Sequence, residues 1–161
     1  EPLTTLTWLA ARTTRIRLQT GILLAALRRP VVLAKTTATL DVLSGGRLDL
    51  GVGVGWQAAE YEAAGLDFSG RGPLLDQALE VCQALWSQPT ASYSGDDLAF
   101  EGIHAMPKPV SGDGVPIWVS GTVNRRTARR LARFGMGWIP WGDDRADITG
   151  GITRMQSLLA E

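Results

Sequence analysis

Two neighbouring stretches, Leu40–Arg47 (LDVLSGGR) and Leu50–Trp56 (LGVGVGW), decide how this chain folds. The first closes an apolar helical pattern, and its paired glycines predict a helix stop because glycine accepts the left-handed conformation of a C-cap. The second is short, apolar and glycine-rich, which is typical of a buried strand whose backbone another group approaches closely. A helix followed at once by a buried strand indicates parallel βα units.

The same alternation continues on both sides of these stretches. Pro30 fits the first turn of a helix, where its missing N–H costs nothing. Residues 87–114 carry turn signals without periodicity, so we expect an irregular excursion with one or two short strands. The predicted strands are Ile16–Leu24, Arg47–Val54, Pro116–Ser120 and Gly137–Trp141, and the predicted helices are Leu3–Ala11, Val31–Val42, Trp56–Ala64, Leu74–Trp86, Asn124–Phe134 and Ile148–Leu159.

These elements predict an α/β chain with about four parallel strands, forming one domain over residues 1–161. A closed (β/α)₈ barrel needs eight strands and typically about 250 residues. Four strands alone leave two open edges. The opening residues Glu1–Thr5 lack an initiator Met and lead straight into a helical pattern. We therefore expect a partial barrel that begins in mid-fold.

Composition narrows the class of partner. Sixteen basic and sixteen acidic side chains cancel, so no net field recruits nucleic acid or an anionic membrane. A small-molecule ligand or a protein partner is favoured. The single cysteine, Cys82, excludes an internal disulfide and is expected in the core. Without a signal peptide or a membrane-length apolar run, we expect a cytoplasmic protein.

Four segments follow the predicted strands, at the edge where barrel enzymes carry their active sites. They are Thr20–Ile22, Gly53–Trp56, Ser120–Val123 and Trp138–Trp141. Small residues beside bulky ones suit a flat ring lying against backbone. Alternatively, the glycines only allow tight turns.

The segment Ser120–Thr122 precedes a helix N-terminus, so it is a candidate phosphate seat, although Thr122 or Asn124 can equally be an ordinary N-cap. Five arginines follow on that helix, and we expect them mainly on a solvated face. Arg125 or Arg126 is the one most suited to reach an anionic ligand.

Other chemistry is weakly indicated. Gly53–Ala58 fits the dinucleotide-binding fingerprint G-x-G-x-x-A, and Asp76 lies near the distance in sequence expected of a ribose-binding acid. Two features count against this interpretation: Gly65 interrupts the following helix, and Asp76 falls inside a helix rather than at the end of a strand. Asp41 and Arg47 are expected to form an ion pair across the glycine turn. His104, the only histidine, lies in the excursion. No Ser-His-Asp set, metal-ligand cluster or P-loop is present, which assigns the hard chemistry to a cofactor.

The combined motifs resemble the luciferase-like monooxygenase superfamily, especially its members that use the deazaflavin coenzyme F-420. Besides Leu40–Trp56, the resemblance rests on the stretches Glu1–Thr5, Arg15–Gly21, Arg71 with Leu75–Asp76, Leu85–Trp86, Pro116–Gly121 and Gly135–Trp138. It implies a TIM barrel whose third to sixth strands lie in this chain.

The resemblance also implies the site. Gly21 and Ile22 match a non-proline cis peptide against the ring, and Gly53, Val54 and Gly55 match backbone at the ring or phosphate. The phosphate turn matches Gly121, Thr122 and Val123 with Ser120 before them, the cleft wall matches Trp138 and Ile139, and Trp56 and Glu60 are expected to border the substrate pocket.

Two departures leave the catalytic acid or base unknown. Well-known deazaflavin dehydrogenases have a glutamate where this chain has Trp56, and the family's Asp-His region has no counterpart here. The resemblance implies hydride transfer between reduced F-420 and a small organic substrate. The alternatives are an FMN-dependent monooxygenase and a non-catalytic flavin-binding remnant. Two copies are expected to pair as a dimer and bury the open half-barrel face.

Overall fold

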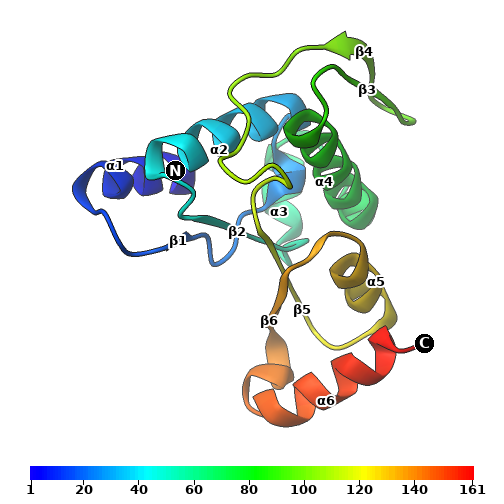
Figure 1. Cartoon of the computed structure of the whole chain (residues 1–161). Coiled ribbons are helices and arrows are strands. Elements are labelled where there is room, and N and C mark those ends of the chain that lie inside the picture. Colours follow the sequence, from blue (N-terminus) through cyan, green and yellow to red (C-terminus); the bar gives the residue numbers. More distant parts are fainter.

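A computed structural model describes all residues 1–161. Its centre is a parallel sheet in the order β1 (Leu18–Gln19), β2 (Leu48–Val52), β5 (Ile117–Gly121) and β6 (Gly137–Pro140), as Figure 1 shows. Helices connect and flank these strands, so the predicted α/β half-barrel with four parallel strands is confirmed.

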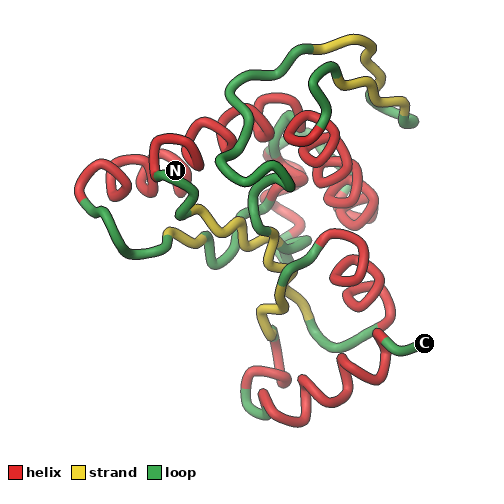
Figure 2. The backbone as a smooth tube through the Cα atoms, in the orientation of Figure 1, coloured by secondary structure: helices red, strands yellow, loops and turns green.

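The remaining elements are helices and one hairpin (Figure 2). The helices are α1 (Pro2–Arg12), α2 (Pro30–Ser44), α3 (Ala58–Ala63), α4 (Arg71–Ser87), α5 (Arg125–Phe134) and α6 (Ile148–Leu159), with short 3-10 turns at Ala25–Leu27, Phe68–Gly70 and Gly142–Arg145. Between α4 and β5, strands β3 (Ala91–Ser94) and β4 (Ala99–Ile103) pair antiparallel. None of the helices combines the length and apolar character needed to cross a membrane.

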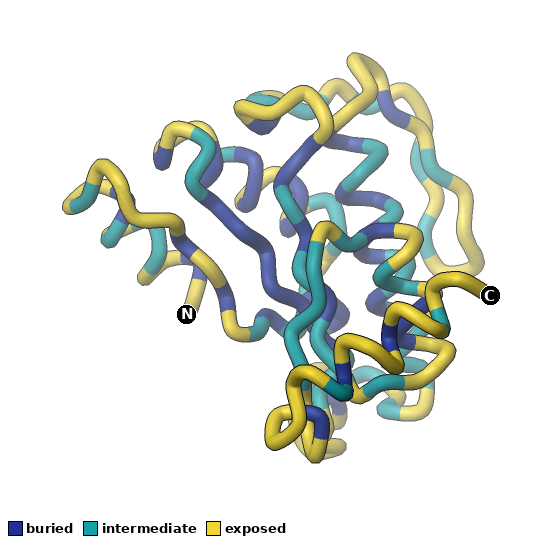
Figure 3. The backbone as a smooth tube through the Cα atoms, turned by 60° about the horizontal axis from the view of Figure 1, so that its bottom comes forward, coloured by how far each residue is buried: buried dark blue, intermediate teal, exposed yellow.

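The two faces of β2 differ sharply. Leu48, Leu50 and Val52 are fully buried within one core cluster that also takes in side chains of α2 and α4. Side chains alternate along a strand, so Asp49 and Gly51 face the other way, towards the interior of the half-barrel. The strand is a continuous buried segment in Figure 3. The outward face therefore holds the fold together, and the inward face beyond Asp49 presents only backbone.

The first strand is shorter than its sequence indicates. The expectation of a strand over Ile16–Leu24 is wrong, because only Leu18 and Gln19 form the ladder with β2. The Gly51 carbonyl accepts hydrogen bonds from both the Thr20 hydroxyl and the Leu23 amide, each at 2.7 Å. The chain between these two donors, including a cis Gly21–Ile22 peptide, bulges out of the ladder before a single bridge joins Leu23 to Val52.

The expected ion pair between Asp41 and Arg47 is also wrong. The Asp41 carboxylate accepts the Val110 amide at 2.8 Å and thereby anchors the segment that leads into β5. The Arg47 guanidinium lies between the ends of α1 and α2 and donates to four carbonyl oxygens, those of Ala10, Thr13, Ile16 and Ser44. Carbonyls at a helix end lack intrahelical partners, and a guanidinium has enough donors to serve several of them.

Cys82 is completely buried on α4, as expected of a core residue, and burial raises the pKa of its thiol. On the same helix, the Trp86 indole donates to the Ala34 carbonyl of α2 at 3.0 Å. The two helices are therefore joined by a directional contact as well as by apolar packing.

A double-mutant cycle with Asp41→Ala and Arg47→Met tests the separate roles of these two residues. We expect each single change to cost about 2 kcal/mol, because each leaves buried hydrogen-bonding groups unpaired. The coupling energy is expected to stay below about 0.5 kcal/mol, since the side chains serve different partners. Urea denaturation measures the unfolding free energy of all four proteins. A coupling energy well above about 1 kcal/mol would show that the two side chains interact directly.

Replacing Gly51 by alanine tests the close approach of β1 to β2. An added Cβ would collide with the Thr20 carbonyl oxygen, a backbone atom with no freedom to rotate away. We expect a loss of about 3 kcal/mol or failure to fold. Gly112→Ala is the matched control, because a Cβ there meets nothing within 4 Å. Equal urea midpoints for the two variants would contradict the contact.

Candidate functional site

The carboxyl ends of the four parallel strands meet along one edge of the sheet. Val52 pairs with Val119, and Ser120 pairs with Ile139. On the other side of β2, Leu23 bridges to Val52 and brings the Gly21–Ile22 bulge to the same edge. The structure thus brings together Gly21–Ile22, Gly53, Ser120 and Ile139, which are far apart in sequence.

This edge of the sheet consists of backbone bordered by apolar side chains. A Cβ placed on Gly21 would meet nothing within 4 Å, so the space beside this exposed backbone is open. At Gly53, a Cβ would run into Ile22 Cδ1 and approach Ser120 Cβ at 3.6 Å. Ile139 Cδ1 reaches across to within 3.1 Å of the position that a Gly51 Cβ would take. Backbone and two isoleucines therefore form the inner surface here.

The other glycines serve the fold. Gly55 has a φ of 73° and packs beside Leu24 and Tyr61, so it supports a turn. Gly121 points away from Ser120, and its Cβ would stand 2.9 Å from the Thr127 hydroxyl of α5. Tight turns and close packing explain these two positions without a ligand. Val54 contributes its carbonyl, which accepts the Tyr61 hydroxyl at 2.7 Å.

Trp138 and Ile139 lie on opposite faces of β6. The Trp138 ring packs against Gly151 of α6, and its indole donates to the Gly121 carbonyl at 2.8 Å. Trp138 therefore braces the turn from the helix side. Trp118, which sequence reasoning missed, shares the inward face with Ser120, and its buried indole nitrogen has no partner. The alternation of Ile117 and Val119 with Trp118 and Ser120 is the signal that identifies it.

The turn from β5 into α5 offers free amide donors. Asn124 caps the helix, because its side-chain oxygen accepts the amides of Arg126 and Thr127. The Val123 amide donates to Asp144 at 2.7 Å. The amides of Thr122, Asn124 and Arg125 have no acceptor within the protein.

Two of the α5 arginines form ion pairs with α4. Arg130, whose side chain is only 11% exposed, forms a two-pronged pair with Asp76 of α4, and Arg133 pairs with Glu80 of the same helix. The other four α5 arginines are exposed, as expected of a mainly solvated face, and Arg130 is the exception because α5 packs beside α4. Asp76 is thereby engaged in a structural pair, which removes the ribose-binding acid of the dinucleotide alternative.

Arg126, in the first turn of α5, is exposed and forms no ion pair, unlike Arg125, which pairs with Glu161 at 3.0 Å. Of the two arginines in this first turn, Arg126 is therefore the one that is free to meet an anion.

The remaining candidates lie at the periphery. Trp56 follows Gly55 with 68% of its surface exposed, and Glu60 is exposed on α3. His104 is exposed, and its ring lies within hydrogen-bond distance of the Thr90 hydroxyl. No group of three or more His, Cys, Asp or Glu side chains is arranged to hold a metal ion.

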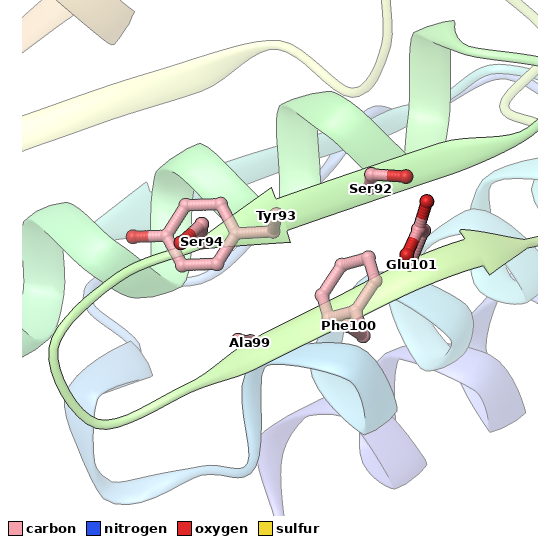
Figure 4. A pocket seen from close by; sticks show the side chains of 6 residues that line it. All are labelled: Ser92, Tyr93, Ser94, Ala99, Phe100 and Glu101. Atoms are coloured by element: carbon pink, nitrogen blue, oxygen red, sulfur yellow. The ribbon is translucent and has the colours of Figure 1, made fainter.

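A separate hollow lies on the β3–β4 hairpin (Figure 4). Its lining comes entirely from the hairpin, and the rings of Tyr93 and Phe100 stand 6.1 Å apart in it. Figure 1 places the hairpin at the opposite end of the molecule from the carboxyl ends of β5 and β6. The hollow is open and shares no residue with the parallel sheet.

Parallel strands with connecting helices, whose carboxyl ends meet along one edge of the sheet, define this chain as part of a (β/α)-barrel protein. It belongs to the luciferase-like monooxygenase family, whose sequence profile matches residues 1–161. Uncharacterized protein Rv0953c of Mycobacterium tuberculosis is 36% identical over 99% of this chain and 56% of its own length. The oxygenase component of the flavin-dependent trigonelline monooxygenase of Acinetobacter baylyi is 32% identical over 70% of this chain and 31% of its own length.

Solved structures share the fold. Monooxygenase RslO1 from Streptomyces bottropensis superimposes with a TM-score of 0.88 at 27% identity, covering 99% of this chain and 49% of that one. An F420-dependent secondary alcohol dehydrogenase has a TM-score of 0.77 at 19% identity, covering 98% of this chain and 48% of that one. The chain thus spans about half the length of Rv0953c and of these two solved structures, and 31% of the length of the trigonelline enzyme component.

Proposed function

We propose that the protein binds a flavin-type cofactor at the carboxyl edge of the sheet and acts as an oxidoreductase on a small organic substrate. The observation that carries this proposal is the open, side-chain-free backbone at Gly21, bordered by Ile22, Gly53 and Ile139. A planar ring needs such a surface, because any projecting side chain would hold it away from the main chain.

The residues at this edge suit both ends of such a cofactor. The ring end is apolar and lies on β1 and β2. The phosphate end is the turn after β5, where unpaired amides begin a helix and the exposed Arg126 carries an unpaired positive charge. Helix N-termini favour anions through free N–H groups and the helix dipole. Trp56 and Glu60 are proposed to border the substrate side, because both follow β2 and are exposed.

We infer FMN as the cofactor and monooxygenation as the reaction class. The trigonelline enzyme component, 32% identical, and RslO1, 27% identical, are both named monooxygenases, and the former is named as flavin-dependent. Trp56, in the place where deazaflavin dehydrogenases have a glutamate, points the same way. Hydride transfer with coenzyme F-420 is the second candidate, supported by the sequence resemblance to members that use that coenzyme.

The cofactor supplies the redox chemistry when bound, and the chain supplies position and environment. Gly21 and Gly53 permit close approach. Ile22 and Ile139 exclude water from the inner surface, which strengthens electrostatic interactions there. Trp138 fixes the Gly121 carbonyl from behind. A general acid or base is not assigned to any residue of this chain.

The ring site is tested by measuring FMN and F-420 binding to the protein and to its Gly21→Ala variant. Alanine at this position meets no protein atom, so the melting temperature should stay unchanged. Its methyl group would enter the space proposed for the ring, and we expect at least about a tenfold loss of affinity. Fluorescence titration with each cofactor also decides between them.

Gly112→Ala serves again as the control and should bind like the wild type. Binding of neither cofactor by the wild type, or unchanged affinity in Gly21→Ala, would contradict the proposal. Oxygen consumption with reduced FMN distinguishes an enzyme from a binding remnant, since binding without turnover supports the remnant. Pairing of two copies stays a prediction, which light scattering tests.

A further inference from the structure

A buried carboxylate lies directly behind the turn that follows β5. Asp144 belongs to the 3-10 turn after β6 and is only 8% exposed. One of its oxygens accepts the Val123 amide at 2.7 Å, and the other accepts the Arg154 guanidinium of α6 at 2.8 Å. The Val123 amide is therefore already occupied by an anion that the protein itself supplies.

Two further contacts fix the same turn. The Trp138 indole holds the Gly121 carbonyl at 2.8 Å, and a Cβ on Gly142 would stand 3.2 Å from the Thr122 methyl group. Strand β6 and the segment after it thus support the turn at three successive residues. The Val123 amide, and after it Arg154, lower the pKa of Asp144, so the carboxylate stays ionised well below neutral pH.

This arrangement changes which groups are free for a phosphate. Sequence reasoning placed Val123 in the phosphate seat, but its amide is engaged. The amides on either side of it, those of Thr122 and Asn124, and the next one at Arg125 have no protein acceptor. The orientation of these amides depends on the orientation of the Val123 peptide, because consecutive peptide groups are joined in one tight turn.

We propose that Asp144 is a positioning residue for the phosphate end of the cofactor. By holding the Val123 amide from behind, it turns the neighbouring amides towards the phosphate. Arg154 balances its charge, which keeps the carboxylate from repelling that phosphate. This inference rests on the proposed function, since it concerns the second end of the same site.

Comparing FMN with riboflavin isolates the phosphate end, because riboflavin carries the same ring without the phosphate. In Asp144→Ala, we expect FMN affinity to fall about tenfold, the size of one lost charge-assisted positioning contact. Riboflavin affinity should change less than about twofold. Asp144→Asn keeps an oxygen that can accept the Val123 amide, so it should recover part of the loss. Isothermal titration calorimetry measures each pair.

Two neighbouring aspartates provide matched controls. Asp143→Ala removes the same charge from an exposed side chain that makes no hydrogen bond or ion pair. Asp147→Ala removes the other partner of Arg154 and the cap at Gly150, but does not touch the β5–α5 turn. Both controls should keep the wild-type ratio of FMN to riboflavin affinity.

The outcomes separate the two proposals. Tighter FMN binding by Asp144→Ala would show that the carboxylate competes with the phosphate, and an equal loss of FMN and riboflavin would show a general structural role. Either result overturns the inference. Equal affinity of the wild type for FMN and riboflavin would also overturn it while leaving the ring site in place. Binding of neither compound would refute the proposed function and this inference together.

Discussion

The contact on which the site depends is the close approach of the Thr20 carbonyl to Gly51. A side chain at position 51 would prevent it, and its absence lets the chain after β1 bend over β2. The Thr20 hydroxyl and the Leu23 amide then converge on the Gly51 carbonyl. Gly21 and Ile22 lie between these two donors. They do not take part in the ladder, and their main chain lies at the edge of the sheet. A local packing requirement thus produces the open surface that a planar ligand needs.

Much of this fold could be predicted from the periodicity of apolar residues and from the residues that begin or end helices. The bounds of α2 are predicted by Pro30 at its start and Gly45 at its end, and β2 is predicted by its apolar run. Each of these signals is local in sequence. The failures share a different cause. The length of β1 depends on where the Thr20 and Leu23 donors find their acceptor, and the partners of Asp41 and Arg47 come from segments distant in sequence. Hydrogen bonds between segments distant in the chain produce no periodic pattern in the sequence.

The candidate site shows the same division. Glycines at strand ends indicate an edge with little side chain, but they do not say which glycines face a ligand. Gly21 faces open space, whereas Gly121 is required by Thr127. Alternation along β6 separates Ile139 from Trp138, a distinction that a motif match ignores. Asp144 was not predicted at all, because nothing in its local sequence shows that it reaches Val123.

The proposed ring surface lies on the backbone of β1 and β2 with Ile139 of β6 at its border, and the proposed phosphate end is the turn after β5. The register between β2 and β5 fixes the distance between these ends. The most direct test of this account is a crystal structure of the protein with FMN bound. The account predicts the isoalloxazine ring against the main chain of Gly21 and Ile22, with Gly53 beside it. A ring bound elsewhere, such as in the hollow of the β3–β4 hairpin, would contradict it.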